Sequence, residues 1–179
     1  VRRGARRLRE RLLESGRVAG VRTSDLSALP YPTSFAFGGA ATSPLPYIVM
    51  TNRMQIVRFV APNGERRILL FNPTDVERAA ETPFFRRLQD GMGELVSGRV
   101  RKLLEKPTPV QHLEAAGIAP EAVDYVAFDH LHTQDLRRTL GTAEARGRFP
   151  NAKLLVSRPE IDILRELHPL QRAWFVKDA

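Results

Sequence analysis

Two histidines separated by a single residue are the part of the sequence best suited to chemistry. His130 and His132 follow an apolar run at residues 123–128. Side chains two residues apart in a strand point to the same side, and in a loop both rings can still converge on one ion. Two neighbouring imidazoles suit zinc, iron or manganese. On spacing alone, the alternative remains a pair of hydrogen-bonded histidines without a metal.

A series of predicted strands comes before the two histidines. The turn residues Asn63-Gly64 stand between two apolar runs and predict a β-hairpin. The antiparallel meander around this hairpin is apolar enough to be largely buried. Upstream of it, prolines and a glycine pair predict short, interrupted β segments over residues 17–47. The meander strands are expected at residues 47–50, 55–60 and 67–71.

Helices are predicted before and after the meander in the sequence, and they alternate with strands in the second half of the chain. An Arg-rich helix opens the sequence and ends at Gly16, and Ser157 is a candidate N-cap for the last helix. This alternation indicates a mixed α/β (α+β) fold. The helical segments are expected at residues 1–16, 83–106, 110–116, 120–122, 136–140 and 159–167, with a strand at 123–128 and another at 151–156.

A strand that ends in His-x-His, followed by a polar pair and a helix, resembles the metallo-β-lactamase fold, whose signature is His-x-His-x-Asp-His. Residues 117–126 are similar to the family's lead into that motif, Gly-Ile-x-Pro-x-x-Ile-Asp-x-Val. Residues 149–157 are similar to the Phe-Pro-Asn-Ala strand of lactonase-like members. The resemblance covers residues 18–179, after an N-terminal helix at residues 1–17. It implies an αβ/βα sandwich, of which the chain holds the N-terminal half and the start of the second.

The motif itself departs from the family pattern. His130 and His132 match its first two histidines, whereas Gln134 stands where the family has Asp and Asp135 where it has His. In the family, the first two histidines bind one metal, and the Asp and the next His serve the second. The resemblance therefore implies one or two divalent ions, zinc before iron or manganese, with His130, His132 and Asp135 as ligands. Gln134 and Asp135 are the candidate catalytic residues, with Gln134 orienting water.

Two functions follow from this altered motif. The first is a metal-dependent hydrolase of small ester, lactone or amide-like substrates, in which a cation makes water acidic enough to attack near neutral pH. The second is a catalytically inactive member of the fold that serves as a binding or scaffold protein. The loss of one carboxylate at Gln134 removes a charge that helps to retain a second cation. The pair Gln134-Asp135 is therefore the feature that discriminates the two.

Other residues that could do chemistry have simpler structural interpretations. His168 is expected at a helix C-terminus, where the helix dipole favours it, and His112 is expected to be structural. Asp75 is interpreted as a turn-stabilising residue. Trp174 and Phe175 are expected to pack against a missing half of the fold or to line a substrate entrance.

The composition of the sequence limits the kinds of partner that the protein could bind. The sequence has no cysteine, which excludes disulfides and thiolate zinc sites and favours a reducing compartment such as the cytoplasm. No apolar run is long enough to cross a membrane. The net charge of +8 is concentrated in residues 1–17, where seven arginines face two glutamates without an interleaved aromatic residue. We therefore expect a small-molecule substrate rather than nucleic acid, and self-association stays open.

We also expect the chain to be part of a larger protein and inactive by itself. It begins with Val1, and 44 residues follow Asp135, too few for the remaining ligands of the family. Half a sandwich would leave a sheet face unburied and favour pairing with another chain.

Overall fold

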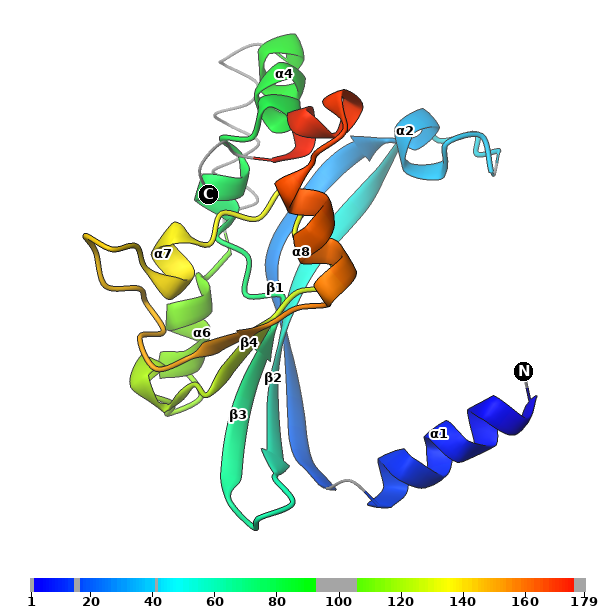
Figure 1. Ribbon diagram of the computed structural model, residues 1–179. Coiled ribbons are helices and arrows are strands. Elements are labelled where there is room, and N and C mark those ends of the chain that lie inside the picture. The colour runs from blue at the N-terminus through cyan, green and yellow to red at the C-terminus, as the bar shows by residue number, and fades with distance from the viewer. Residues whose placement is uncertain (1, 15–16, 41, 93–105, 176–179) are drawn as a thin grey trace.

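The computed structural model describes residues 2–14, 17–40, 42–92 and 106–175, and Figure 1 shows the arrangement of their elements. In these residues one mixed sheet has the strand order β1-β2-β3-β4-β5, in which the first three strands are antiparallel and β3, β4 and β5 are parallel. The strands are β1 (Arg17–Pro32), β2 (Tyr47–Val60), β3 (Arg66–Phe71), β4 (Tyr125–Ala127) and β5 (Lys153–Leu155). The mixed α/β class expected from the sequence is confirmed.

The long ribbon of β1 and β2 differs from the sequence prediction. Of the short β segments expected over residues 17–47, residues 17–32 form one strand, β1, and residues 33–37 form the helix α2, which was not predicted. Strand β1 pairs with β2 along its length and has register shifts at Val18/Gly20 and Asp25/Ser27. Its two prolines, Pro30 and Pro32, do not interrupt it, because β1 is an edge strand with only one neighbour to pair with. The separate strands predicted at 47–50 and 55–60 are likewise one continuous strand, β2.

The hairpin predicted at Asn63-Gly64 is confirmed. The amide of Ala61 donates to the carbonyl of Glu65 at 2.8 Å, and the amide of Gly64 donates to the carbonyl of Ala61 at 2.9 Å. The side chain of Asn63 accepts a hydrogen bond from the amide of Glu65. Local turn chemistry therefore determines the register of β2 against β3.

The helices are short, and most begin or end where the sequence indicates. The predicted N-terminal helix is confirmed as α1, which lies exposed and apart from the sheet (Figure 1). The helix predicted at 83–106 is observed as far as Met92, and its residues 93–105 lie outside the described part of the chain. In that part, no helix is both long enough and apolar enough to cross a lipid bilayer. The helices are α1 (Arg2–Glu14), α2 (Thr33–Phe37), α3 (Val76–Ala79), α4 (Pro83–Met92), α6 (Pro109–Glu114), α7 (Arg137–Leu140) and α8 (Arg158–Arg165), with 3₁₀ turns η1 (Pro120–Ala122) and η2 (Pro169–Trp174).

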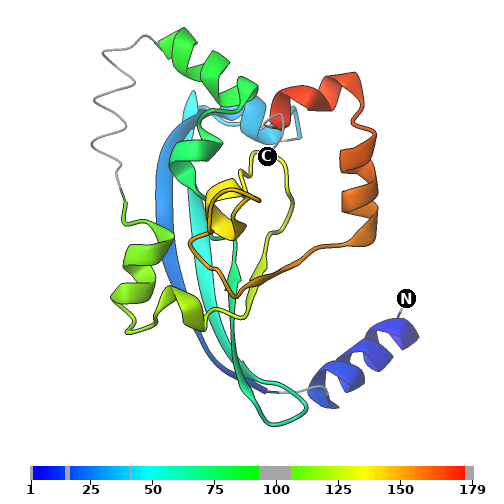
Figure 2. The ribbon, with the colours of Figure 1, turned by 60° about the vertical axis from the view of Figure 1, so that its left-hand side comes forward.

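The core lies between one face of the sheet and α6. Alternate residues of the strands point to this face, as the period of two in a strand requires. Figure 2 shows α6 and α8 on opposite sides of the sheet. The capping box of Thr108 and Gln111 fixes the start of α6, which presents Leu113 to the core. The buried apolar cluster consists of Leu26, Met54, Ile56, Leu70, Leu113, Ile118, Val123, Val126 and Phe149.

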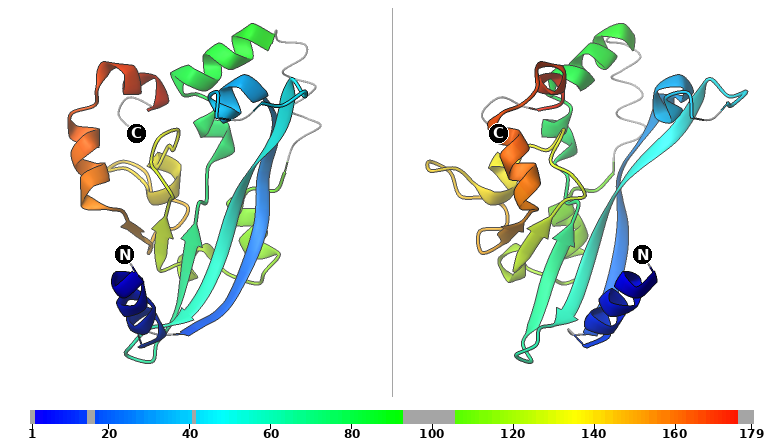
Figure 3. Two further views of the ribbon diagram at one scale, coloured as in Figure 1. Left: turned by 90° about the vertical axis from the view of Figure 1, so that its right-hand side faces the viewer. Right: turned by 45° about the vertical axis from the view of Figure 1, so that its right-hand side comes forward.

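The far part of the β1–β2 ribbon, over residues 47–53 of β2, is not buried. Residues 47–54 of β2 pair only with β1, since the pairing with β3 starts at Gln55. Tyr47, Val49 and Met50 are exposed there, and Figure 3 shows this part of the ribbon extending past the other strands. The prediction of a largely buried meander is therefore wrong for this half of β2.

Candidate functional site

The two histidines lie in a loop that follows β4, at the carboxyl end of the parallel strands. Asn72, which follows the neighbouring strand β3, ties the two strand ends together. Its amide donates to the carbonyl of Ala127 at 2.8 Å, and its side-chain oxygen accepts from the amide of Asp129 at 2.8 Å. Asn72 has a φ of 54°, a conformation that asparagine tolerates better than most residues. These bonds position the start of the histidine loop.

The structure brings His130 and His132 into contact. Their ring centroids lie 3.7 Å apart, with the planes at 85°. The Nδ1 atom of His130 lies 2.6 Å from Oδ1 of Asp129, and the Asp129 carboxylate also accepts from the His130 amide at 2.9 Å. A carboxylate at Nδ1 fixes the ring and leaves Nε2 as the available nitrogen, as in metal-binding histidines.

The surroundings of His132 favour its neutral form. Burial lowers the pKa of its imidazole below the ordinary value of 6.5, and the neighbouring His130 lowers the pKa further. The neutral imidazole is the form that binds metal ions. Glu160, from α8, reaches the same loop and accepts a hydrogen bond from the amide of Leu131.

An aromatic group closes one side of the histidine pair. The indole of Trp174, in η2, meets the His132 ring edge-on at 5.4 Å and stacks on the Phe84 ring of α4 at 3.9 Å. The Trp174 carbonyl accepts from the amide of Thr133 at 2.6 Å. Thr133 has a φ of 61°, which is unusual for a β-branched residue and is the kind of strain found at functional sites. Trp174 therefore packs within this chain, beside the histidines.

Asp135 does not join the histidines. Its side chain is fully buried, at 0% relative exposure, and accepts hydrogen bonds from three nitrogens of Arg137: the amide at 3.1 Å, Nε at 3.0 Å and Nη2 at 2.6 Å. The hydrogen bonds of the Arg137 side chain hold the pKa of the Asp135 carboxyl below its ordinary value. Gln134 is also buried, at 8%. Among the described residues, no three His, Asp or Glu side chains are grouped as a metal site would require.

Substituting Asp135 by Asn should lower the free energy of unfolding by about 1–2 kcal/mol. Breaking a buried ion pair costs about 3–5 kcal/mol, but the Arg137 side chain is 36% exposed, so solvent screens part of the interaction. Urea denaturation at pH 7 measures the change. Asp162→Asn, which removes an exposed partner of Arg165, is the control and should change stability by less than about 0.5 kcal/mol. Equal effects of the two substitutions would contradict a structural role for the Asp135–Arg137 pair.

The remaining candidates from the sequence have structural contacts. Asp75 caps α3 by accepting from the amide of Arg78, which confirms its interpretation as a turn residue. His112 lies on α6, with Nε2 at 3.2 Å from the carbonyl of Asp25. The prediction for His168 at a helix C-terminus is wrong, because α8 ends at Arg165 and His168 caps the start of η2 through Nδ1.

Sequence reasoning missed several neighbours of the histidines. Asp129 precedes His130 directly, and the adjacency of an acidic residue and a histidine was a usable signal. Asn72 and Glu160 are far from the motif in the sequence, and no local pattern points to them. Their contribution depends on strand order and on the place of α8.

The mixed sheet and its likeness to solved structures show the fold: the chain has part of a metallo-β-lactamase fold, as its sequence resemblance implied. In particular, it is similar to AidC, a dizinc quorum-quenching lactonase, with a TM-score of 0.51 and 12% identity over 86% of this chain and 48% of that one. It is also similar to a probable metal-dependent hydrolase from Staphylococcus aureus, with a TM-score of 0.52 and 10% identity over 90% of this chain and 55% of that one. No protein-family model matches the sequence, and no curated protein does.

The chain spans about half the length of these solved structures. The prediction of a metallo-β-lactamase-like half is thus confirmed for the fold. At identities of 10% and 12%, the likeness establishes the fold and leaves the chemistry to the residues of this chain.

Proposed function

We propose that the protein is a metal-dependent hydrolase of small ester, lactone or amide-like substrates, with His130 and His132 as ligands of one divalent cation. The observation that carries this proposal is the contact of the two rings, 3.7 Å apart, at the carboxyl end of parallel strands. Asp129 orients one ring, and burial keeps the other neutral. Both features favour metal binding over two solvated histidines.

The side chains at the histidine pair supply only part of the ligand set that a divalent cation needs. Two imidazoles suit zinc, with iron or manganese as alternatives. The third predicted ligand, Asp135, is committed to Arg137 and could bind a metal only after releasing that guanidinium. A cation at the histidines would polarise the scissile carbonyl and make water acidic enough to attack at neutral pH. The protein's own part is to hold the imidazoles through Asp129 and to limit water access through Trp174.

The substrate class is drawn from the similar structures and from the site together. AidC is described as a lactonase in complex with a homoserine product, which supports a lactone or related ester here. The stacked rings of Phe84 and Trp174 beside His132 offer an apolar surface for the substrate's carbon chain.

An inactive binding protein is the second candidate. It is favoured by one observation, the bidentate ion pair that keeps Asp135 away from the histidines. In that case the histidine pair would be a remnant of the fold, without a bound metal.

Metal content of the full-length protein, measured by elemental analysis after purification without chelator, separates the two candidates. Gln134→Asp should raise zinc affinity about 10-fold, because it returns a carboxylate to the loop next to the two imidazoles. Gln134→Asn introduces a side chain of the same size as Asp but without its charge, and it should not raise the zinc affinity. The measurement is a competition titration with a zinc chelator at pH 7.

Stoichiometric zinc in the unmodified protein, with turnover of a simple lactone that a chelator abolishes, would support the hydrolase. Absence of metal from the protein, together with no gain from Gln134→Asp, would reject it and favour the binding protein.

A further inference from the structure

A second polar site lies away from the histidine pair, between α3, α7 and the loop that precedes β5. It is a surface hollow of about 310 Å³, of the size of the smaller ligand pockets in proteins. Unlike such pockets, it is lined mainly by guanidinium groups. The lining residues are Arg78, Arg137, Arg138, Thr142, Ala145, Arg146 and Arg148.

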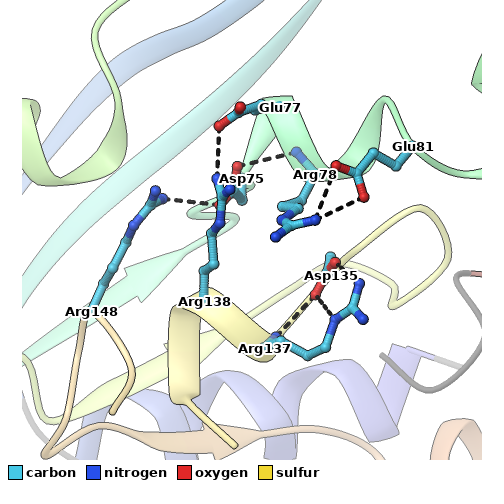
Figure 4. Close-up of polar contacts among 8 residues, drawn as sticks. All are labelled: Asp75, Glu77, Arg78, Glu81, Asp135, Arg137, Arg138 and Arg148. Atoms are coloured by element: carbon cyan, nitrogen blue, oxygen red, sulfur yellow. Dashed lines mark hydrogen bonds and ion pairs between the residues drawn. The ribbon is translucent and has the colours of Figure 1, made fainter. Parts of the chain in front are cut away.

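Four carboxylates that are not among the lining residues hold four of these arginines, and Figure 4 shows their contacts. Buried Asp75 lies 3.0 Å from Nη1 of Arg148 and 3.7 Å from Nη1 of Arg138. Glu77 also binds Arg138, at 2.7 Å. Arg78 donates to both carboxylate oxygens of Glu81, at 2.9 and 3.0 Å. Arg137 is bound to Asp135.

The loop that carries Arg146 and Arg148 contains two glycines at a close approach of the backbone. Gly141 has a φ of 97°, and a Cβ there would lie 2.6 Å from the amide nitrogen of Gly147. A Cβ on Gly147 would lie 2.3 Å from the carbonyl carbon of Leu140. The two backbones therefore approach too closely for any side chain, and Thr142 closes the turn between them by accepting from the amides of Glu144 and Ala145. The turn that carries Arg146 and Arg148 therefore requires glycine at positions 141 and 147.

The charges around the hollow do not cancel. Five arginines line it, and four carboxylates (Asp75, Glu77, Glu81 and Asp135) pair with four of them. Arg146 is exposed, and its side chain forms no hydrogen bond or ion pair within the described residues. A guanidinium has five N–H donors, and the ion pairs of Arg78, Arg138 and Arg148 each use one nitrogen. Each of these three side chains therefore keeps N–H donors that its ion pair does not use.

We propose that this hollow binds the phosphate group of a small phosphorylated molecule. Arginine is suited to oxyanions because its planar fork forms paired hydrogen bonds. The guanidiniums come from α3, α7 and the 141–148 turn, so they approach one hollow from different directions. A tetrahedral phosphate presents acceptor oxygens in three directions, whereas a carboxylate presents two in one plane. Since carboxylates already hold four of the five arginine side chains, binding costs less conformational entropy than it would with five unpaired arginines.

This site shares only the Asp135–Arg137 pair with the residues considered for the hydrolase site, and its chemistry is different. It needs neither a metal nor the two histidines, and it would be retained if the hydrolase proposal failed.

The test uses Arg146→Gln in the full chain, because this substitution removes a guanidinium without breaking an ion pair of the described residues. Binding of inorganic phosphate and of phenyl phosphate is measured by isothermal titration calorimetry at low salt, with acetate and dimethyl phosphate as the comparison anions. We expect both phosphates to bind saturably and Arg146→Gln to weaken them about 10-fold. Arg66→Gln, an exposed arginine at the start of β3, is the matched control and should leave binding unchanged.

Arg148→Gln provides a second variant, and its folding is checked by circular dichroism. A folded Arg148→Gln protein with weakened phosphate binding would support the site. The proposal is overturned if neither phosphate binds saturably, if both variants bind like the unmodified chain, or if acetate binds as tightly as phosphate. Equal binding of dimethyl phosphate would overturn the assignment to a phosphate monoester and point to a nucleic-acid backbone.

Discussion

Substituting His132 by Ala should lower the zinc affinity of the full-length protein by more than about 100-fold. Loss of a group that only orients a metal-binding histidine costs about 10- to 100-fold, and loss of the ligand itself costs more. His132 is the better choice of the two histidines because burial lowers the pKa of its imidazole, which favours the neutral form that binds metal. Competition with a zinc chelator measures the affinity, and lactone turnover should fall in parallel.

His112→Ala is the matched control. This histidine lies on α6 and contacts the carbonyl of Asp25, so its removal changes the histidine count without affecting the pair. Asp129→Asn should lower the zinc affinity more than His112→Ala and less than His132→Ala. It weakens the hydrogen bond to His130 Nδ1 but leaves both rings in place. The role of His132 as a ligand would be refuted by equal zinc affinity in the His132→Ala and His112→Ala proteins.

Replacing Phe149 by Ala should lower the free energy of unfolding by about 3–5 kcal/mol, the usual cost of emptying a phenylalanine site in a core. The Phe149 ring is 1% exposed and belongs to the buried cluster under the sheet. Its amide donates to the carbonyl of Thr139 and so joins the loop before β5 to α7. Because the total stability of a domain is about 5–15 kcal/mol, such a loss is a large share of it.

Urea denaturation followed by circular dichroism at pH 7 measures this change. Leu170→Ala is the control, since its side chain is 81% exposed and its loss should cost less than about 0.5 kcal/mol. A shift for Phe149→Ala no larger than that of the control would mean that the site collapses around the missing ring or that the core lies elsewhere.

Local patterns in the sequence were sufficient for the elements that depend on neighbouring residues. The hairpin follows from Asn63-Gly64, whose conformational preferences are local. The strand that leads to His130 and His132 follows from an apolar run that ends in polar residues. The family resemblance predicted the fold of the chain. The proximity of the two histidines was predicted because a single residue separates them in the sequence.

Only the tertiary structure decided which partners these residues have. Pro30 and Pro32 read as strand breakers, and their acceptance depends on β1 being at the edge of the sheet, which is a matter of strand order. Asp135 read as a metal ligand, but the start of α7 turns Arg137 back onto it, and a buried carboxylate is stabilised by the nearest guanidinium. Trp174 reaches the histidines because η2 packs against α4. The arginine-lined hollow likewise depends on α3 and its N-cap lying beside the 137–148 segment. These contacts join residues 61 and 73 positions apart, which no local pattern of charge could reveal.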